Sequence, residues 1–128
     1  MVHSPGFLKV VDEARPRVKE ITIDEARARL KQNPQAILLD VREDKEWQNG
    51  HTVSARHLGK GILERDIETL IPDPNSEVIM YCGGGYRSAL AAESLGQMGY
   101  ANVRSMDGGI RAWREAGYPL EQGRERKN

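Results

Sequence analysis

One seven-residue segment of the chain has the composition of a reactive anion site. It reads Cys82-Gly83-Gly84-Gly85-Tyr86-Arg87-Ser88 and contains the single cysteine of the 128 residues. Consecutive glycines let a backbone turn tightly, and converging amide groups then form a nest that binds anions. A thiolate is such an anion, and the N-terminus of a following helix stabilises it further. The segment therefore predicts that Cys82 is a nucleophile cradled by residues 83–88.

Each reactive residue of this segment also has a plainer interpretation. A lone cysteine is commonly buried and inert, but a core position needs no amide-lined bowl, so we favour the nucleophile. Arg87 is expected to hold an anionic donor or acceptor, because a planar guanidinium suits oxyanions; an ion pair on the helix surface is its alternative. Tyr86 either lines the mouth of the pocket or covers the loop, and the sequence does not choose between them.

A single cysteine also limits the reaction that the chain can carry out. It can form no internal disulfide, and no second thiol is present to resolve a group bound to Cys82. Any such group must leave to an outside acceptor. His51 and His57 have no partner at the spacing of metal ligands, and His3 lies near the N-terminus, so we expect no metal and no cofactor.

The elements that must position Cys82 can be recognised from the sequence pattern. The cysteine follows an apolar run, residues 77–81, and precedes a helical pattern over 87–98. Residues 36–41 form a second apolar run, and such runs are typical of strands buried on both faces. Shorter strands are predicted at 20–23 and 102–106, and further helices at 7–18, from an Asp24 cap to Asn33, and at 44–48, 62–70 and 109–116. This alternation predicts an α/β fold with a mostly parallel sheet of about five strands, helices on both faces and a ligand site beyond the carboxyl ends of the strands.

Several other polar and aromatic residues invite functional interpretation. Asp40 and Arg42 follow a predicted strand and could assist proton transfer. We favour the alternative that Asp40, Arg42 and Glu46 tie the loops together, since a preformed thiolate needs little proton shuttling. Trp47 and Trp113 are assigned to the core.

Three motifs of the chain together resemble those of the rhodanese family of sulfurtransferases. CGGGYRS is similar to the family's cysteine loop, LLDVREDKEWQNGH to its N-terminal signature, and DGGIRAWREAGYPL to its C-terminal signature. The chain departs from the family pattern at Thr52-Val53-Ser54-Ala55, where we expect a different loop conformation. The resemblance implies a three-layer rhodanese-like fold over residues 20–120.

The resemblance also implies an activity, in which a sulfane sulfur passes from a donor such as thiosulfate or a persulfide to cyanide or a thiol. Cys82 would carry it as a persulfide, and residues 83–88 would bind the substrates. A small-molecule donor and acceptor are implied, and a protein acceptor is open. Two alternatives remain: a non-catalytic protein-interaction module, in which the cysteine is usually replaced, and a cysteine phosphatase. Phosphatases related to this fold have five residues between cysteine and arginine, whereas four intervene here.

The remaining segments and the composition complete the prediction. Residues 1–19 are expected to form a helical extension packed on the domain, and residues 121–128 a disordered tail. The 19 basic and 19 acidic residues balance, which does not indicate a nucleic-acid partner. No apolar run of about 18 residues or secretory signal is visible, so we predict a cytoplasmic protein without a membrane partner.

Overall fold

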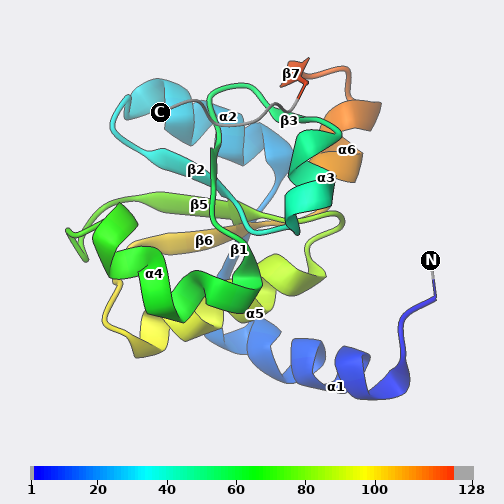
Figure 1. Cartoon of the computed structure of the whole chain (residues 1–128), viewed down its shortest axis with the longest axis vertical. Coiled ribbons are helices and arrows are strands. Elements are labelled where there is room, and N and C mark those ends of the chain that lie inside the picture. Colours follow the sequence, from blue (N-terminus) through cyan, green and yellow to red (C-terminus); the bar gives the residue numbers. More distant parts are fainter. Residues whose placement is uncertain (1, 123–128) are drawn as a thin grey trace.

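A five-stranded parallel sheet forms the centre of the computed structural model, which describes residues 2–122. Its strands lie in the order β1-β6-β5-β2-β4 (Figure 1). Their bounds are Lys19–Ile21 for β1, Val103–Met106 for β6, Val78–Tyr81 for β5, Ile37–Asp40 for β2 and Arg56–His57 for β4. The predicted fold class is confirmed, although β4 was not among the expected strands.

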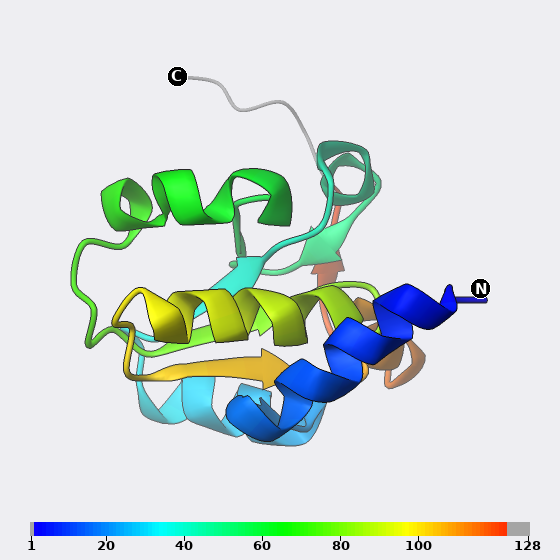
Figure 2. The same ribbon diagram turned by 90° about the horizontal axis from the view of Figure 1, so that it is seen from below.

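Helices cover both faces of this sheet (Figures 1 and 2). On one face lie α1 (Pro5–Ala14), α4 (Leu63–Leu70) and α5 (Tyr86–Gln97), and on the other α2 (Ile23–Gln32) and α6 (Gly109–Glu115). Alternate residues of β5 point to opposite faces, so Val78 and Met80 join one buried cluster and Ile79 and Tyr81 the other. All four are fully buried, as the apolar run predicts.

The N-terminal extension lies along α5. Val11 and Ala14 of α1 are buried there, and a short 3-10 helix, η1 (Arg15–Arg17), connects α1 to β1. The neighbouring Val10 points away from this contact and is 46% exposed.

The helix α2 begins earlier than predicted. Its N-cap is Thr22 and not Asp24: the Glu25 amide donates to Thr22 Oγ1 at 3.1 Å, and the Thr22 amide donates to Glu25 Oε1 at 2.8 Å. This reciprocal pair is a capping box, which satisfies two amides that the helix itself leaves free. Asp24 instead lies in the first turn.

Two short strands outside the main sheet were not predicted. β3 (His51–Thr52) and β7 (Leu120–Glu121) pair antiparallel, with His51 opposite Glu121. The expected disordered tail thus begins with a residue that forms a strand, and its residues 123–128 lie outside the described part of the chain. Before β3 comes α3 (Asp44–Gln48), and before α4 comes η2 (Lys60–Ile62). No helix among residues 2–122 is both long and apolar enough to cross a membrane.

Candidate active site

Cys82 lies at the carboxyl end of β5, the middle strand of the sheet, and is 1% exposed. Its Sγ accepts hydrogen bonds from the Gly85 amide at 3.2 Å and the Ser88 amide at 3.3 Å. The helix α5 begins at Tyr86, one residue earlier than predicted, with Gly85 as its N-cap. The sulfur therefore sits at the N-terminus of α5, where amide groups and the helix dipole favour negative charge.

The three glycines of the loop have different roles. Only Gly85 has a positive φ, of 103°, and a Cβ there would lie 3.2 Å from the amide nitrogen of Gly108. Of the three, Gly85 is thus the one whose backbone conformation favours glycine. Gly83 and Gly84 instead leave room for two guanidinium groups, since a Cβ would lie 3.3 Å from Arg87 Nη2 or 3.4 Å from Arg111 Nη1, respectively.

The start of α6 holds the cysteine loop from the other side. The Ile110 amide donates to the Cys82 carbonyl at 2.9 Å, and the Arg111 amide donates to the Gly83 carbonyl at 3.1 Å. This close approach requires Gly109, which has a φ of 57° and whose Cβ would overlap the Cys82 carbonyl oxygen. Gly109, the second glycine of the DGG motif, thus allows the backbone at the start of α6 to pack against the backbone of the cysteine loop.

A pair of buried serines adjoins the sulfur. Ser88 Oγ lies 3.6 Å from Cys82 Sγ and 2.7 Å from Ser105 Oγ on β6, and both serines are fully buried. A hydroxyl accepts from a thiol and donates to a thiolate, so this pair can satisfy either state of Cys82. Ser88 was predicted from its place in the loop, whereas Ser105 was not predicted, because its only signal was a polar residue in a short predicted strand.

Arg87 is both close to the sulfur and engaged in an ion pair. Its Nη1 and Nη2 donate to the two carboxylate oxygens of Glu46, on α3, at 2.7 and 3.0 Å. These bonds raise the pKa of Arg87, and the nearby Cys82 sulfur raises it further. Hydrogen bonding from Arg87 in turn lowers the pKa of Glu46 below its ordinary value. The two interpretations of Arg87 therefore do not exclude each other.

Asp40 and Arg42 form a buried pair that ties two loops together. Arg42 Nη2 lies 2.8 Å from Asp40 Oδ2 and also donates to the Gly50 carbonyl at 2.7 Å. No hydrogen bond among residues 2–122 joins either side chain to Cys82 or to residues 83–88. This geometry supports the favoured structural role, but Glu46, expected to belong to the same group, pairs with Arg87 instead.

Tyr86 packs against the N-terminal extension. Its ring centroid is 4.4 Å from that of His3 and 6.1 Å from that of Phe7, and the Arg15 guanidinium lies 5.2 Å away over the ring. The ring also lies next to Gly84. Tyr86 therefore covers part of the loop, and residues of the extension cover Tyr86.

The two tryptophans differ in their surroundings. Trp113 is 4% exposed and belongs to the core, as expected. Trp47 is only half-buried, and its ring stacks on His51 at 3.4 Å and lies 4.9 Å from His57. The core assignment of Trp47 is wrong because α3 packs against β3, which lies outside the main sheet. Within residues 2–122 there is no cluster of three or more His, Cys, Asp or Glu that could hold a metal ion.

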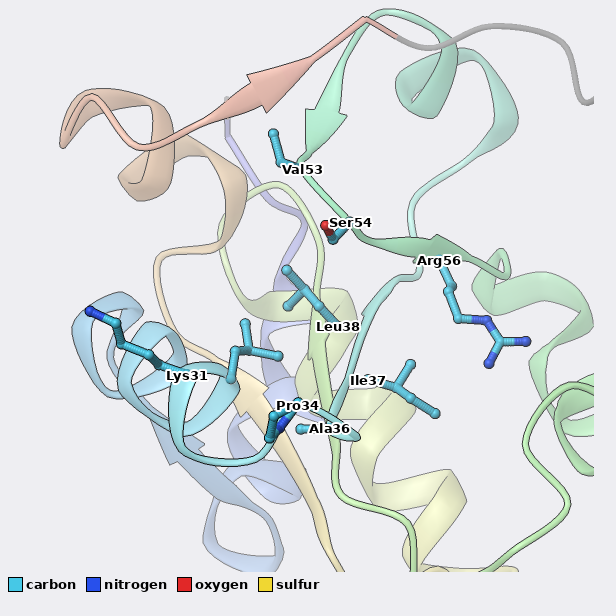
Figure 3. A pocket seen from close by; sticks show the side chains of 9 residues that line it. Lys31, Pro34, Ala36, Ile37, Leu38, Val53, Ser54 and Arg56 are labelled. Atoms are coloured by element: carbon cyan, nitrogen blue, oxygen red, sulfur yellow. The ribbon is translucent and has the colours of Figure 1, made fainter.

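A separate hollow lies between α2, β2 and the turn after β3 (Figure 3). Ile37 and Leu38 begin β2 there, whereas the site described above lies at the carboxyl ends of the strands. None of the residues that line this hollow belongs to the cysteine loop. They are Leu30, Lys31, Pro34, Ala36, Ile37, Leu38, Val53, Ser54 and Arg56.

Comparison with known families agrees with this geometry. The profile described as Rhodanese-like domain matches residues 22–116, which include β2, the cysteine loop and α6. The chain belongs to the rhodanese family. The extension formed by α1 and η1 lies wholly outside the matched region.

Relatives of this rhodanese carry names that indicate sulfur transfer. Thiosulfate sulfurtransferase GlpE of Vibrio cholerae is 34% identical over 101 residues, which cover 79% of this chain and 92% of that protein. The polysulfide-sulfur transferase of Wolinella succinogenes has a similar structure, with a TM-score of 0.79, 26% identity and coverage of 96% and 92% of the two chains. A Rhodopseudomonas palustris protein of unknown function, described as a possible tyrosine phosphatase, has a TM-score of 0.78 at 30% identity, with 94% and 98% covered. This rhodanese is accordingly a sulfurtransferase.

Proposed function

We propose that this rhodanese moves a sulfane sulfur through a persulfide on Cys82, with the loop of Gly83, Gly84, Gly85, Tyr86, Arg87 and Ser88 binding the substrates. The donor is thiosulfate or a persulfide, and the acceptor is a thiol or cyanide. The observation that carries this proposal is the convergence of two loop amides on Cys82 Sγ at the N-terminus of α5. Such a setting stabilises the thiolate before reaction and the anionic persulfide after it.

The reaction divides into two displacements at sulfur. The Cys82 thiolate attacks the outer sulfur of thiosulfate, so that an Sγ–S bond forms, the S–S bond of the donor breaks and sulfite leaves with the electron pair. Cys82 is oxidised to the persulfide while the donor is reduced to sulfite, and no proton need move. An acceptor thiolate then attacks the outer sulfur of the persulfide, which breaks the Sγ–S bond and restores the Cys82 thiolate.

The burial of Cys82 restricts which acceptors can reach the persulfide in the second step. With 1% of the residue exposed, only a small molecule or a projecting thiolate of a protein can reach a sulfur attached there.

Phosphate transfer is the rival reaction because a structurally similar protein is described as a possible phosphatase. Four residues separate Cys82 from Arg87, one fewer than in phosphatases related to this fold, so the bowl is smaller. The ion pair with Glu46 also offsets the charge that Arg87 would give to a phosphoryl group. Both features favour sulfur over phosphate.

Intact-mass measurement tests the proposal directly. Incubation with thiosulfate should add the mass of one sulfur atom, and cyanide or a thiol should remove it. Cys82→Ser should acquire no such adduct, whereas Ser94→Ala, on the same helix as Ser88, should behave as the wild type. The absence of any adduct with thiosulfate or glutathione persulfide would contradict sulfur transfer. Hydrolysis of an aryl phosphate that disappears in Cys82→Ser would replace it with phosphatase activity.

A further inference from the structure

Arg111, on α6, lies directly against the cysteine loop. Its Nη1 and Cζ lie 3.4 and 3.8 Å from the place where a Gly84 side chain would begin. Its backbone amide donates to the Gly83 carbonyl at 3.1 Å, so the main chain fixes the position of Arg111 relative to Cys82. The residue itself is exposed and can meet an incoming ligand.

The charges around the loop distinguish Arg111 from its neighbours. Glu46 offsets the charge of Arg87, with both carboxylate oxygens bonded to the guanidinium. Asp107, which flanks Gly85, lies 3.8 Å from Arg15. None of the ion pairs among residues 2–122 includes Arg111. Arg87 and Arg15 are thus paired with carboxylates, whereas Arg111, which also lies beside the loop, has no carboxylate partner among residues 2–122.

We propose that Arg111 is a positioning residue that binds the anionic group of the sulfur donor while the transferable sulfur meets Cys82. This inference rests on the sulfur transfer proposed above and narrows the donor class. Donors with an oxyanion group next to the sulfane sulfur, as in thiosulfate and thiosulfonates, are favoured over uncharged ones. A guanidinium suits this task because its planar fork binds two oxygens of one group. The only cation of the loop itself, Arg87, is already paired with Glu46.

Steady-state kinetics with donors of different charge test this role. Arg111→Ala should raise KM for the doubly charged thiosulfate about tenfold, and Arg111→Glu more, because one charge interaction near a protein surface is lost or reversed. The effect should be smaller for the singly charged methanethiosulfonate, and kcat should change little. Arg114→Ala removes an equally charged, exposed residue of the same helix and should leave KM unchanged. Equal KM values for the wild type and Arg111→Glu would overturn the inference but not the persulfide mechanism, which intact mass monitors separately.

A second measurement is independent of sulfur transfer. Iodoacetate and iodoacetamide both alkylate cysteine thiolates and should both react with Cys82, but only iodoacetate is charged. In Arg111→Ala the ratio of the two rates, iodoacetate over iodoacetamide, should fall several-fold, while Arg114→Ala should keep the ratio of the wild type. An unchanged ratio in Arg111→Ala would overturn the anion-binding role even if thiosulfate proved to be a substrate. A wild type that alkylates as expected but forms no persulfide would overturn the proposed function and, with it, the assigned donor class.

Discussion

Both oxygens of the Glu46 carboxylate accept hydrogen bonds from the Arg87 guanidinium, at 2.7 and 3.0 Å. This pair joins α3 to the first turn of α5, the helix whose N-terminus faces the Cys82 sulfur. It also offsets the positive charge that Arg87 presents to a ligand. The electrostatic character of the loop therefore depends on Glu46 as well as on Arg87.

Replacement of Glu46 should lower the stability of the folded protein by an amount that depends on pH. The pKa of Glu46 is lowered in the folded state, so its stabilising effect is present above its ordinary pKa of 4.5 and is lost as the pH falls through the folded value. Glu46→Gln should lower the free energy of unfolding at neutral pH by less than about 1 kcal/mol, because the pair is partly exposed and screened. Urea unfolding at neutral pH and at about pH 3.5 should show this deficit shrinking in acid. Glu64→Gln, at an exposed position of α4, is the control; a deficit of Glu46→Gln that does not change with pH would contradict the assignment.

Gly109→Ala should destabilise the protein and displace the cysteine loop. An added Cβ would overlap the Cys82 carbonyl, and the positive φ adds backbone strain, for a combined cost of about 2 kcal/mol or more. Gly96→Ala is the matched control, because it lies on α5 in open space and should stabilise the helix by roughly 0.5–1 kcal/mol. Chemical unfolding of both variants and the wild type measures these differences in the free energy of unfolding. Equal stability of Gly109→Ala and the wild type would show that the contact between α6 and the loop can relax.

Ser88→Ala should slow persulfide formation without greatly changing thiosulfate binding. The hydroxyl lies 3.6 Å from the sulfur, farther than the two amides, so we expect a loss of about tenfold in rate. Ser105→Ala should have a smaller effect, since it removes only the partner of Ser88. Single-turnover mass measurements give these rates, with Ser94→Ala as the control. A rate for Ser88→Ala equal to that of Ser94→Ala would mean that the hydroxyl takes no part.

Asp40→Asn should be the most destabilising of these substitutions. It leaves the Arg42 guanidinium buried without its counter-charge, which costs about 3–5 kcal/mol. Asp66→Asn also breaks an arginine–aspartate pair, but the pair is at the surface and its loss should leave the midpoint of unfolding unchanged. If Asp40→Asn unfolds at the same denaturant concentration as Asp66→Asn, the buried pair does not tie the loops together.

The local part of the site could be predicted from the sequence. The apolar run before Cys82 indicates a buried strand, and the glycines with the helical pattern that follows indicate the turn. Those features depend on neighbours in the chain, and the structure has β5 and α5 within two residues of the predicted bounds. The helix α3 likewise has the predicted bounds, Asp44–Gln48.

The partners of the site residues could not be predicted in this way. Ser105 reaches Ser88 only because β6 pairs with β5, and Glu46 reaches Arg87 across 41 positions of the chain. Arg111 was part of a recognised motif, but its contact with Gly84 follows from how α6 docks. These relationships depend on the packing of separate elements, which sequence spacing does not encode.

The shortest strands escaped prediction for a different reason. β3, β4 and β7 have two residues each, too few to show the alternation by which strands are recognised. Trp47 was misassigned for a related reason. Its stacking partner His51 belongs to β3, an element that the pattern did not reveal.

The pairing of β3 with β7 links β7 to the cysteine loop through a series of side-chain contacts. Glu121 lies opposite His51, whose ring stacks on Trp47, the residue next to Glu46 in α3. Glu46 in turn holds Arg87. Truncations or fusions that disrupt Leu120 or Glu121 would therefore remove the strand that pairs with His51 and disturb the position of α3. Engineered versions of this protein should leave β7 intact.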